Sequence, residues 1–114
     1  MISHGSVYDR DRDDRSGWRV LIMRRWPRGV RKDQVDVWLK DAAPSPVLLQ
    51  AYHHEGLLWA QFETRYRAEM LARPAILNQI RELERVHGEV RLLCYERIPP
   101  EEHCHRLVLQ DLLR

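Results

Sequence analysis

The chain of 114 residues lacks several features that would assign it to a specialised class. No apolar run approaches the roughly 20 residues of a membrane span, and the N-terminal MISHGSVYDRDRDD has no signal-peptide apolar region. We therefore expect a cytoplasmic protein without a membrane segment. Only two cysteines are present, and in a reducing compartment two cysteines are free thiols or metal ligands more often than a structural bridge.

Lysine is scarce as well. Nearly all of the 19 basic side chains are arginine, which forks onto carboxylates and phosphates where lysine acts as a point charge. Residues 1–32 carry nine basic and four acidic side chains, a net charge of +5, and the remaining residues carry ten and thirteen, a net of −3. The pI near 8.7 falls short of the value above about 9 that marks a dedicated nucleic-acid-binding domain, and no helix-turn-helix pattern is present.

The composition is that of one globular domain. Hydrophobic residues make up 44% and charged residues 32% of the chain, and no internal repeat or long linker divides it. The sequence therefore predicts a single domain over residues 1–114. Within it, DRDRDDRSG (9–17) is typical of a charged loop, which we expect to be mobile in the absence of partners.

Three segments favour β-strands. GSVYD (5–9) is short and β-prone, and WRVLIM (18–23) has a run of apolar residues that ends before Arg24 and Pro27. The third segment is EVRLLCYER (89–97).

Apolar residues at helical spacing predict helices elsewhere. Ser45 is a candidate N-cap with Pro46 at the first helical position, and Gly88 is a candidate C-terminal cap. The predicted helices cover residues 32–42, 46–52, 57–73, 74–87 and 101–114. This order of elements predicts an α/β fold, a helix-rich single domain in which helices cover a small, largely parallel sheet of about three strands.

The stretch LLCYERIPPEEHCHR (92–106) holds both cysteines and is the first candidate site. Alternate residues of a strand share a face, so Cys94 and Glu96 project together at the carboxyl end of the predicted strand, where open α/β sheets bind ligands. The helix predicted next turns Cys104 inward, with His105 about 100° around the helix. The candidate catalytic side chains expected to converge are Cys94, Glu96, Cys104 and His105.

Three chemistries fit this cluster. Thiolate, imidazole and carboxylate groups are ligands for zinc or iron, but nine residues separate the cysteines and there is no C-x-x-C pair, so a metal is not favoured. Cys104 lies among histidine and arginine neighbours in the first turns of the predicted helix, and their positive potential favours a reactive thiol. A Cys94–Cys104 redox pair is the third option. Each cysteine alone also fits a small buried hydrophobe.

The second candidate site is R-R-W-P-R-G (24–29), directly after the strand over 18–23. In a parallel sheet this loop leaves at the same end as Cys94. Arginines and a glycine that allows close backbone approach suit an anion, and an indole ring can stack on a base. The alternative is a solvated loop whose arginines pair with nearby acids. The candidate ligand-binding residues are Arg24, Trp26, Arg28, Gly29 and, at the first site, Arg106.

Four motifs taken together resemble a known family. They are R-V-L-I-M-R-R-W-P-R-G (19–29), W-L-K-D-A-A-P-S (38–45), Y-H-H (52–54) ahead of W-x-x-F-x-x-R-Y-x-x-E (59–69), and L-L-C-Y-E…H-C-H-R (92–106). In this order and spacing they are similar to domain-of-unknown-function family 488, the YeaO-like proteins. The resemblance covers nearly the whole chain but implies no settled reaction. It implies that a motif of the family's longer branch includes Cys94, Glu96, Cys104, His105 and Arg106.

The chain departs from the family at one position. Members usually read V-D-R-L-W-P-R-G, whereas this chain has Met23 in place of the acid. A role that needs a carboxylate at this position either passes to Glu96 or is weakened.

Three functions are consistent with these patterns. The favoured one is a small-molecule site at the carboxyl edge of the sheet, with enzymatic activity as one option. There, Arg24 and Arg28 would hold an anionic group such as a phosphate, and the first candidate site would supply proton transfer, thiolate chemistry or metal binding. The second is a nucleic-acid-binding or regulatory module that uses the arginine-rich first third. The third is a structural or interaction protein, and the sequence does not determine the oligomeric state.

Overall fold

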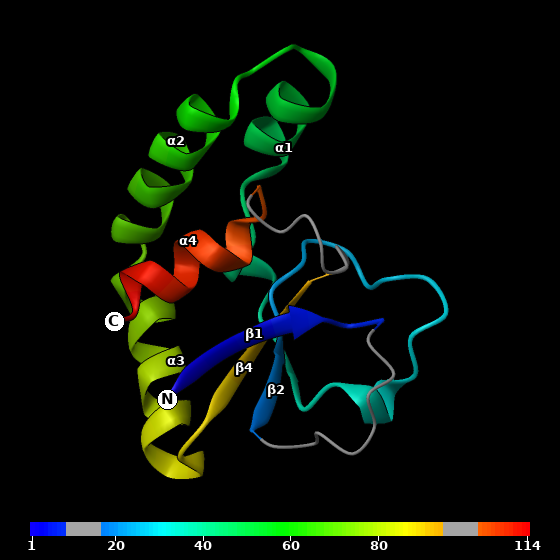
Figure 1. Cartoon of the computed structure of the whole chain (residues 1–114), viewed down its shortest axis with the longest axis vertical. Coiled ribbons are helices and arrows are strands. Elements are labelled where there is room, and N and C mark those ends of the chain that lie inside the picture. The colour runs from blue at the N-terminus through cyan, green and yellow to red at the C-terminus, as the bar shows by residue number, and fades with distance from the viewer. Residues whose placement is uncertain (9–16, 95–102) are drawn as a thin grey trace.

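The computed structural model of the chain describes residues 1–8, 17–94 and 103–114. In these ranges it has four strands, β1 (Ile2–Ser6), β2 (Trp18–Leu21), β3 (Val37–Trp38) and β4 (Val90–Cys94). The α-helices in the same ranges are α1 (Pro46–His54), α2 (Trp59–Leu71), α3 (Pro74–His87) and α4 (His105–Leu112). Short 3-10 turns, η1 (Lys32–Gln34) and η2 (Lys40–Ala42), flank β3 (Figure 1).

The strands form one parallel sheet in the order β1-β4-β2-β3. Strand β4, late in the sequence, lies in the interior of the sheet, with Leu92 opposite His4 on one side and Val20 on the other. The predicted α/β class with a parallel sheet is confirmed. The sheet has four strands rather than about three among the described residues, because β3 lies inside a segment predicted to be helical.

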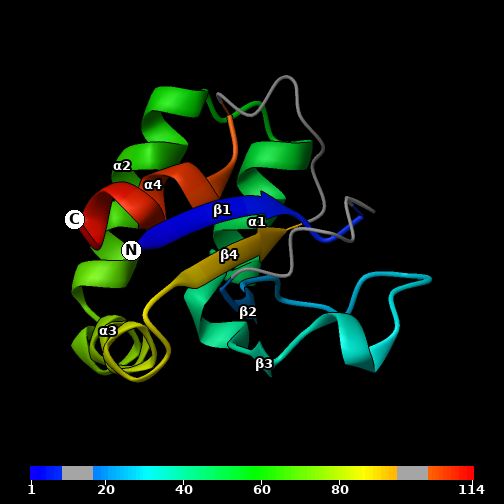
Figure 2. The same cartoon turned by 60° about the horizontal axis from the view of Figure 1, so that its bottom comes forward.

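All four α-helices contribute to the core on one face of the sheet. Val20 and Leu92 of the sheet pack there with side chains of every helix, including Leu48, Phe62, Ile80 and Val108. The opposite face is covered by the chain that follows β2, where Leu21 and Leu93 pack with residues such as Val30 and Trp38. Figure 2 shows the helices gathered on one side of the sheet and the loop with η1 standing apart on the other. We call these the helix-covered face and the loop-covered face.

Several predicted helix signals are confirmed. The Ser45 side chain caps α1 by accepting a hydrogen bond from the Leu48 backbone N–H, and Pro46 is the first helical residue. On α2 the row Phe62, Tyr66 and Met70 is fully buried, as its spacing of four residues predicts. Leu58, which stands four residues before Phe62, lies before the helix and is 67% exposed.

The helix predicted over residues 32–42 is wrong. Between the turns η1 and η2 the chain is extended and pairs with β2, and the Asp36 backbone N–H donates to the Arg19 carbonyl at 2.8 Å. The Asp36 carboxylate also accepts from the Arg19 backbone N–H at 2.8 Å. The β-branched residues Val35 and Val37 fit an extended chain at least as well as a helix, and pairing with the sheet decides between the two.

The start of the last helix also differs from the prediction over 101–114. Cys104 has extended backbone angles, φ −125° and ψ 138°, and α4 begins only at His105. Cys104 therefore precedes the helix rather than lying in its first turns. The predicted charged loop over 9–17 and the predicted strand end at 95–97 lie largely outside the described residues. In the described ranges, no helix combines the length and the apolar character needed to cross a membrane.

Gly88 gives a test of the turn between α3 and β4. Its φ is +84°, and a Cβ added there would meet nothing within 4 Å, so a substitution has only backbone strain to overcome. We expect Gly88→Ala to lower the free energy of unfolding by about 1–3 kcal/mol, measured by urea denaturation. Gln79→Ala, an exposed change on the same helix, is the control and should stay within about 0.5 kcal/mol of wild type. An unchanged stability of Gly88→Ala would contradict the turn geometry.

Candidate functional site

The two sulfur atoms of the chain lie together in the interior. Cys94 Sγ and Cys104 Sγ are 2.8 Å apart, and either can donate to the other. Both are free cysteines, and their exposed fractions are 0% and 1%. The sequence predicted that these residues converge, and the structure brings them into direct contact.

The local structure explains why they meet. In β4 the side chains alternate between the faces, so Leu93 packs on the loop-covered face and Leu92 on the helix-covered face. Cys94, the last residue of β4, projects on the same side as Leu92. Cys104 is the extended residue that precedes α4, and α4 packs on the helix-covered face through Val108. The pair therefore lies at the carboxyl end of the sheet, on the helix-covered face.

Arg106 brings a positive charge to this pair. Its Nη1 donates to Cys94 Sγ at 3.0 Å, and the side chain is fully buried. A guanidinium beside a sulfur interacts more favourably with the thiolate than with the neutral thiol. The arrangement therefore places a buried positive charge against the Cys94 sulfur.

His105 links the start of α4 to β2. Its Nε2 lies 2.7 Å from the carbonyl oxygen of Ile22, and the residue is 9% exposed. A carbonyl oxygen can only accept, so Nε2 carries a proton. The imidazole also meets Tyr66 edge to face, with ring centroids 5.6 Å apart.

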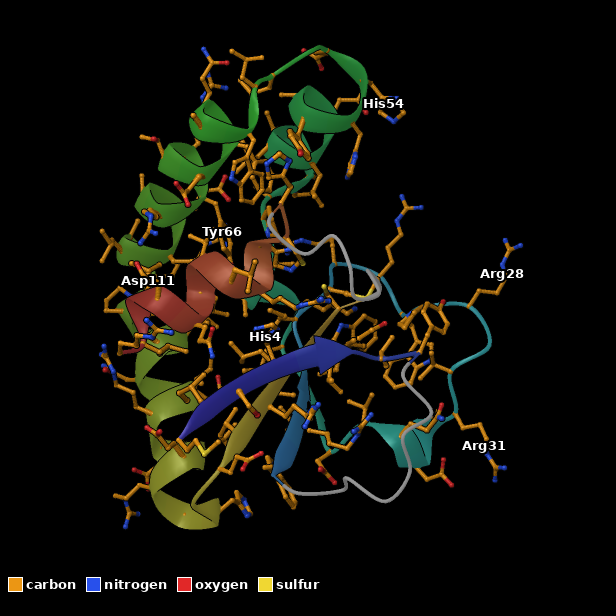
Figure 3. All side chains as sticks on the ribbon, in the orientation of Figure 1. His4, Arg28, Arg31, His54, Tyr66 and Asp111 are labelled. Atoms are coloured by element: carbon orange, nitrogen blue, oxygen red, sulfur yellow. The ribbon has the colours of Figure 1, made fainter. Side chains whose placement is uncertain are left out.

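Tyr66 is buried beside this cluster on α2, between that helix and α4 (Figure 3). Its hydroxyl donates to the Ala42 carbonyl at 2.6 Å. Burial raises the pKa of Tyr66 well above its ordinary value, and the nearby Cys104 and Glu69 raise it further. The phenol is therefore a neutral hydrogen-bond donor that holds the end of η2 against the site.

Arg24 has its bonds within the protein rather than toward an open pocket. Its Nη1 pairs with Asp41 Oδ1 at 3.0 Å, and its Nη2 lies 3.2 Å from the carbonyl oxygens of both Ala43 and Pro44. For Arg24, these contacts agree with the second interpretation of the R-R-W-P-R-G loop, in which its arginines pair with nearby acids instead of binding a ligand. The partner is Asp41, and the pair connects the chain after β2 to η2.

Sequence reasoning missed the acid on this side of the site. The Glu69 carboxylate accepts from both the backbone N–H and the hydroxyl of Ser45. Arg73 donates to the Asp41 carbonyl at 2.9 Å. Glu69 lies three residues after the buried Tyr66, nearly one turn along α2. This spacing places the two side chains on neighbouring parts of the helix surface and could have identified Glu69 from the sequence. Four side chains, Arg24, Tyr66, Glu69 and Arg73, therefore bind the segment 41–45.

Trp26, Arg28 and Gly29 lie apart from the sulfur pair. Trp26 packs on the loop-covered face, and its Nε1 donates to the Val30 carbonyl at 2.9 Å. Arg28 is exposed and points into solvent on the far side of the molecule from Tyr66 (Figure 3). Gly29 has a φ of +79° and forms the expected turn. The two candidate sites thus share one end of the sheet but lie on opposite faces.

The sequence analysis singled out two positions for a carboxylate, Glu96 and the family's acid position, which is Met23 in this chain. Glu96 lies outside the described residues. Met23, which stands where the family has an acid, packs against the apolar cluster of the loop-covered face. Within residues 1–8, 17–94 and 103–114, no three His, Cys, Asp or Glu side chains are grouped to hold a metal ion.

The buried Tyr66 hydroxyl gives a pH-dependent prediction. Because folding raises its pKa, the unfolded chain loses this proton first as the pH increases. The free energy of unfolding should therefore fall as the pH rises above about 10, the ordinary tyrosine value. We expect Tyr66→Phe to lose stability at neutral pH, by about 1–3 kcal/mol for the unpaired Ala42 carbonyl, and to show a smaller alkaline decline in urea denaturation. Tyr52→Phe is the control and should keep the wild-type decline; the same slope in both variants would contradict the assignment.

The sulfur pair gives a redox prediction. We expect oxidised glutathione to join Cys94 to Cys104, with release of two molecules of reduced glutathione and loss of both free thiols. The short distance between the sulfurs means that little backbone movement is needed. Intact-mass and peptide mass spectrometry would detect the intramolecular bridge. Cys104→Ser should not form it, and thiols that stay free until the protein is unfolded would contradict the geometry.

Comparisons with known proteins agree with this arrangement of motifs. The family model DUF488-N3a, described as the active DUF488-N3 subclade, matches residues 3–114. Uncharacterized protein Rv3073c of Mycobacterium tuberculosis is 44% identical over 79 residues, which are 68% of this chain and 65% of that protein. Uncharacterized protein Mb3100c of Mycobacterium bovis matches equally. Uncharacterized protein YeaO of Escherichia coli is 39% identical over 66 residues, 56% of each chain.

These matches span somewhat less than two-thirds of the length of the mycobacterial relatives and just over half of YeaO. No solved structure matches the chain. The family model, by contrast, extends over nearly the whole chain and includes both cysteines, His105 and Arg106. The chain therefore belongs to the DUF488 family of YeaO-like proteins.

Proposed function

We propose that the carboxyl edge of the sheet, on the helix-covered face, is a thiol-based active site for an anionic small molecule. The observation that carries this proposal is the contact of Cys94 Sγ with Arg106 Nη1 at 3.0 Å and with Cys104 Sγ at 2.8 Å. In open parallel sheets this edge is the usual place for a ligand. The description of the matching family model as an active subclade supports an enzymatic role.

The energetics of burial support a function for the cluster. Taking a guanidinium out of water carries a large desolvation cost, and well-packed apolar residues often stabilise a core at least as well as buried charges. Arg106 is fully buried and contacts a sulfur. This contact places a buried positive charge beside a thiol. A site that must stabilise a thiolate gains directly from it.

The residues have distinct roles in this proposal. Cys94 is the reactive thiol, and Arg106 stabilises its charged form. Cys104 is a second thiol within reach of the first, and the His105 imidazole, which Nε2 holds on Ile22, serves proton transfer. Tyr66 positions the end of η2.

An anionic ligand fits the charge at this edge. Arg106 is buried there and follows His105, which contacts the Ile22 carbonyl. Arginines are suited to planar oxyanions such as carboxylates and phosphates. Two buried free thiols also fit a reducing compartment, which supports the proposed cytoplasmic location.

The test is the rate at which iodoacetamide alkylates Cys94 in the native protein, followed by peptide mass spectrometry. We expect inorganic phosphate to slow alkylation, about tenfold at roughly ten times its dissociation constant, because the anion occupies the edge in front of the sulfur. Sodium chloride at matched ionic strength should not do so. Arg106→Lys keeps a charge but loses the planar fork, and we expect it to weaken the protection.

Two results would overturn the proposal. One is a native alkylation rate that equals the rate of global unfolding, which would make Cys94 an inaccessible core residue. The other is an alkylation rate that phosphate leaves unchanged at every concentration. The protein unfolded in guanidinium is the control for both, since phosphate should have no effect on its cysteines.

A further inference from the structure

The loop-covered face carries a groove that is separate from the sulfur pair. It is open to solvent and has a volume of about 570 Å³, which is within the size range of small-molecule sites. Its walls come from the loop after β2, from η1 and from the sheet-edge strand β3. The lining residues are Trp26, Lys32, Val35, Asp36, Val37 and Trp38.

The two indole rings in this groove are held in fixed positions. Trp26 Nε1 donates to the Val30 carbonyl at 2.9 Å, and Trp38 Nε1 donates to the Met23 carbonyl at 2.7 Å. The rings meet edge to face with centroids 5.4 Å apart. Because their polar atoms are bonded to the backbone, the rings present aromatic surface to the groove without an unsatisfied N–H.

Positive charge borders this aromatic surface. Lys32 lines the groove and is exposed, and the adjacent Arg31 side chain is 80% exposed. Arg28 and Arg31 both extend into solvent on this side of the molecule (Figure 3). Residues 25–36 carry four basic and two acidic side chains, a net charge of +2. The groove is therefore complementary to a planar group that bears a negative charge.

The acids near the groove limit the kind of ligand. Asp36 lines the groove and accepts from the Arg19 backbone, and Asp33 lies 3.6 Å from Arg31. A single phosphate needs only the cations Lys32 and Arg31 as its partners. A continuous phosphate backbone would have to pass them and would be repelled.

We propose that this groove binds a mononucleotide, with the base against Trp26 and the phosphate toward Lys32 and Arg31. Stacking on an aromatic ring accepts any base, and the cations bind the phosphate. This site does not depend on the thiol site proposed above, because the two lie on opposite faces of the sheet. Single-stranded nucleic acid is the competing occupant.

The experiment measures binding of adenosine 5′-monophosphate to the full chain by ligand-observed NMR, with adenosine and ribose 5-phosphate as part-ligands. We expect the monophosphate to bind more tightly than either part, since only it uses both the rings and the cations. Lys32→Glu, an exposed change, should weaken binding at least about fivefold, and Trp26→Leu by a similar factor, the equivalent of about 1 kcal/mol. Lys32→Arg should keep most of the affinity. Arg65→Ala, an exposed change on α2, is the matched control and should leave it unchanged.

Three results would overturn the proposal. The first is that adenosine 5′-monophosphate does not bind, and the second is that a folded Lys32→Glu variant binds it as tightly as wild type. The third is that a single-stranded oligonucleotide binds more than about tenfold more tightly than the mononucleotide, with an affinity that falls steeply as salt is added. The last result would assign the groove to nucleic acid. Because Lys32 is a surface residue, its variants keep the test decisive even where Trp26→Leu fails to fold.

Discussion

Strand β4 is hydrogen-bonded on both sides and covered on both faces, and the remaining structure is arranged around it. Beyond the end of the paired β1 register, the Val7 backbone N–H donates to the Cys94 carbonyl at 2.7 Å, and on the other side Ile22 donates to the Leu93 carbonyl at 3.0 Å. Four of its five side chains are fully buried, all except Arg91. A parallel strand with both faces covered has no solvated side for polar groups. Chemistry at the end of such a strand must therefore take place in a site with little water.

This constraint explains the combination of groups at the carboxyl end of β4. Cys94 can be buried at low cost, because cysteine behaves as a small hydrophobe. A carboxylate at the same point would need charged or hydrogen-bonding partners. The positive partner, Arg106, comes from the first turn of α4, and it can approach because Cys104 keeps an extended backbone before that helix. The extended residue is therefore what allows two thiols and a guanidinium to meet.

The sequence predicted the parts of this fold that depend on local patterns. The cap at Ser45, the row from Phe62 to Met70 and the buried strand over 90–94 follow from residue types and their spacing alone. The segment 32–42 does not, because Val35, Trp38 and Leu39 fit helical spacing while the two valines favour a strand. Hydrogen bonds to β2, distant in sequence, decide the outcome. The pairing of Arg24 with Asp41 is equally non-local, and only the placement of η2 beside the end of β2 makes it possible.

The same limit applies to the position of the two candidate sites. Sequence order places R-R-W-P-R-G and Cys94 at one end of a parallel sheet, but it does not assign the loop to a face. Two adjacent carbonyls show how the chain serves both faces: Ile22 accepts from His105 on the helix-covered face, and Met23 accepts from Trp38 on the loop-covered face. These two residues form one short, doubly anchored stretch. Because Ile22 and Met23 are adjacent, the chain moves from the contacts of one face to those of the other within a single residue, and only the hydrogen bonds of the folded chain decide which side each contact serves.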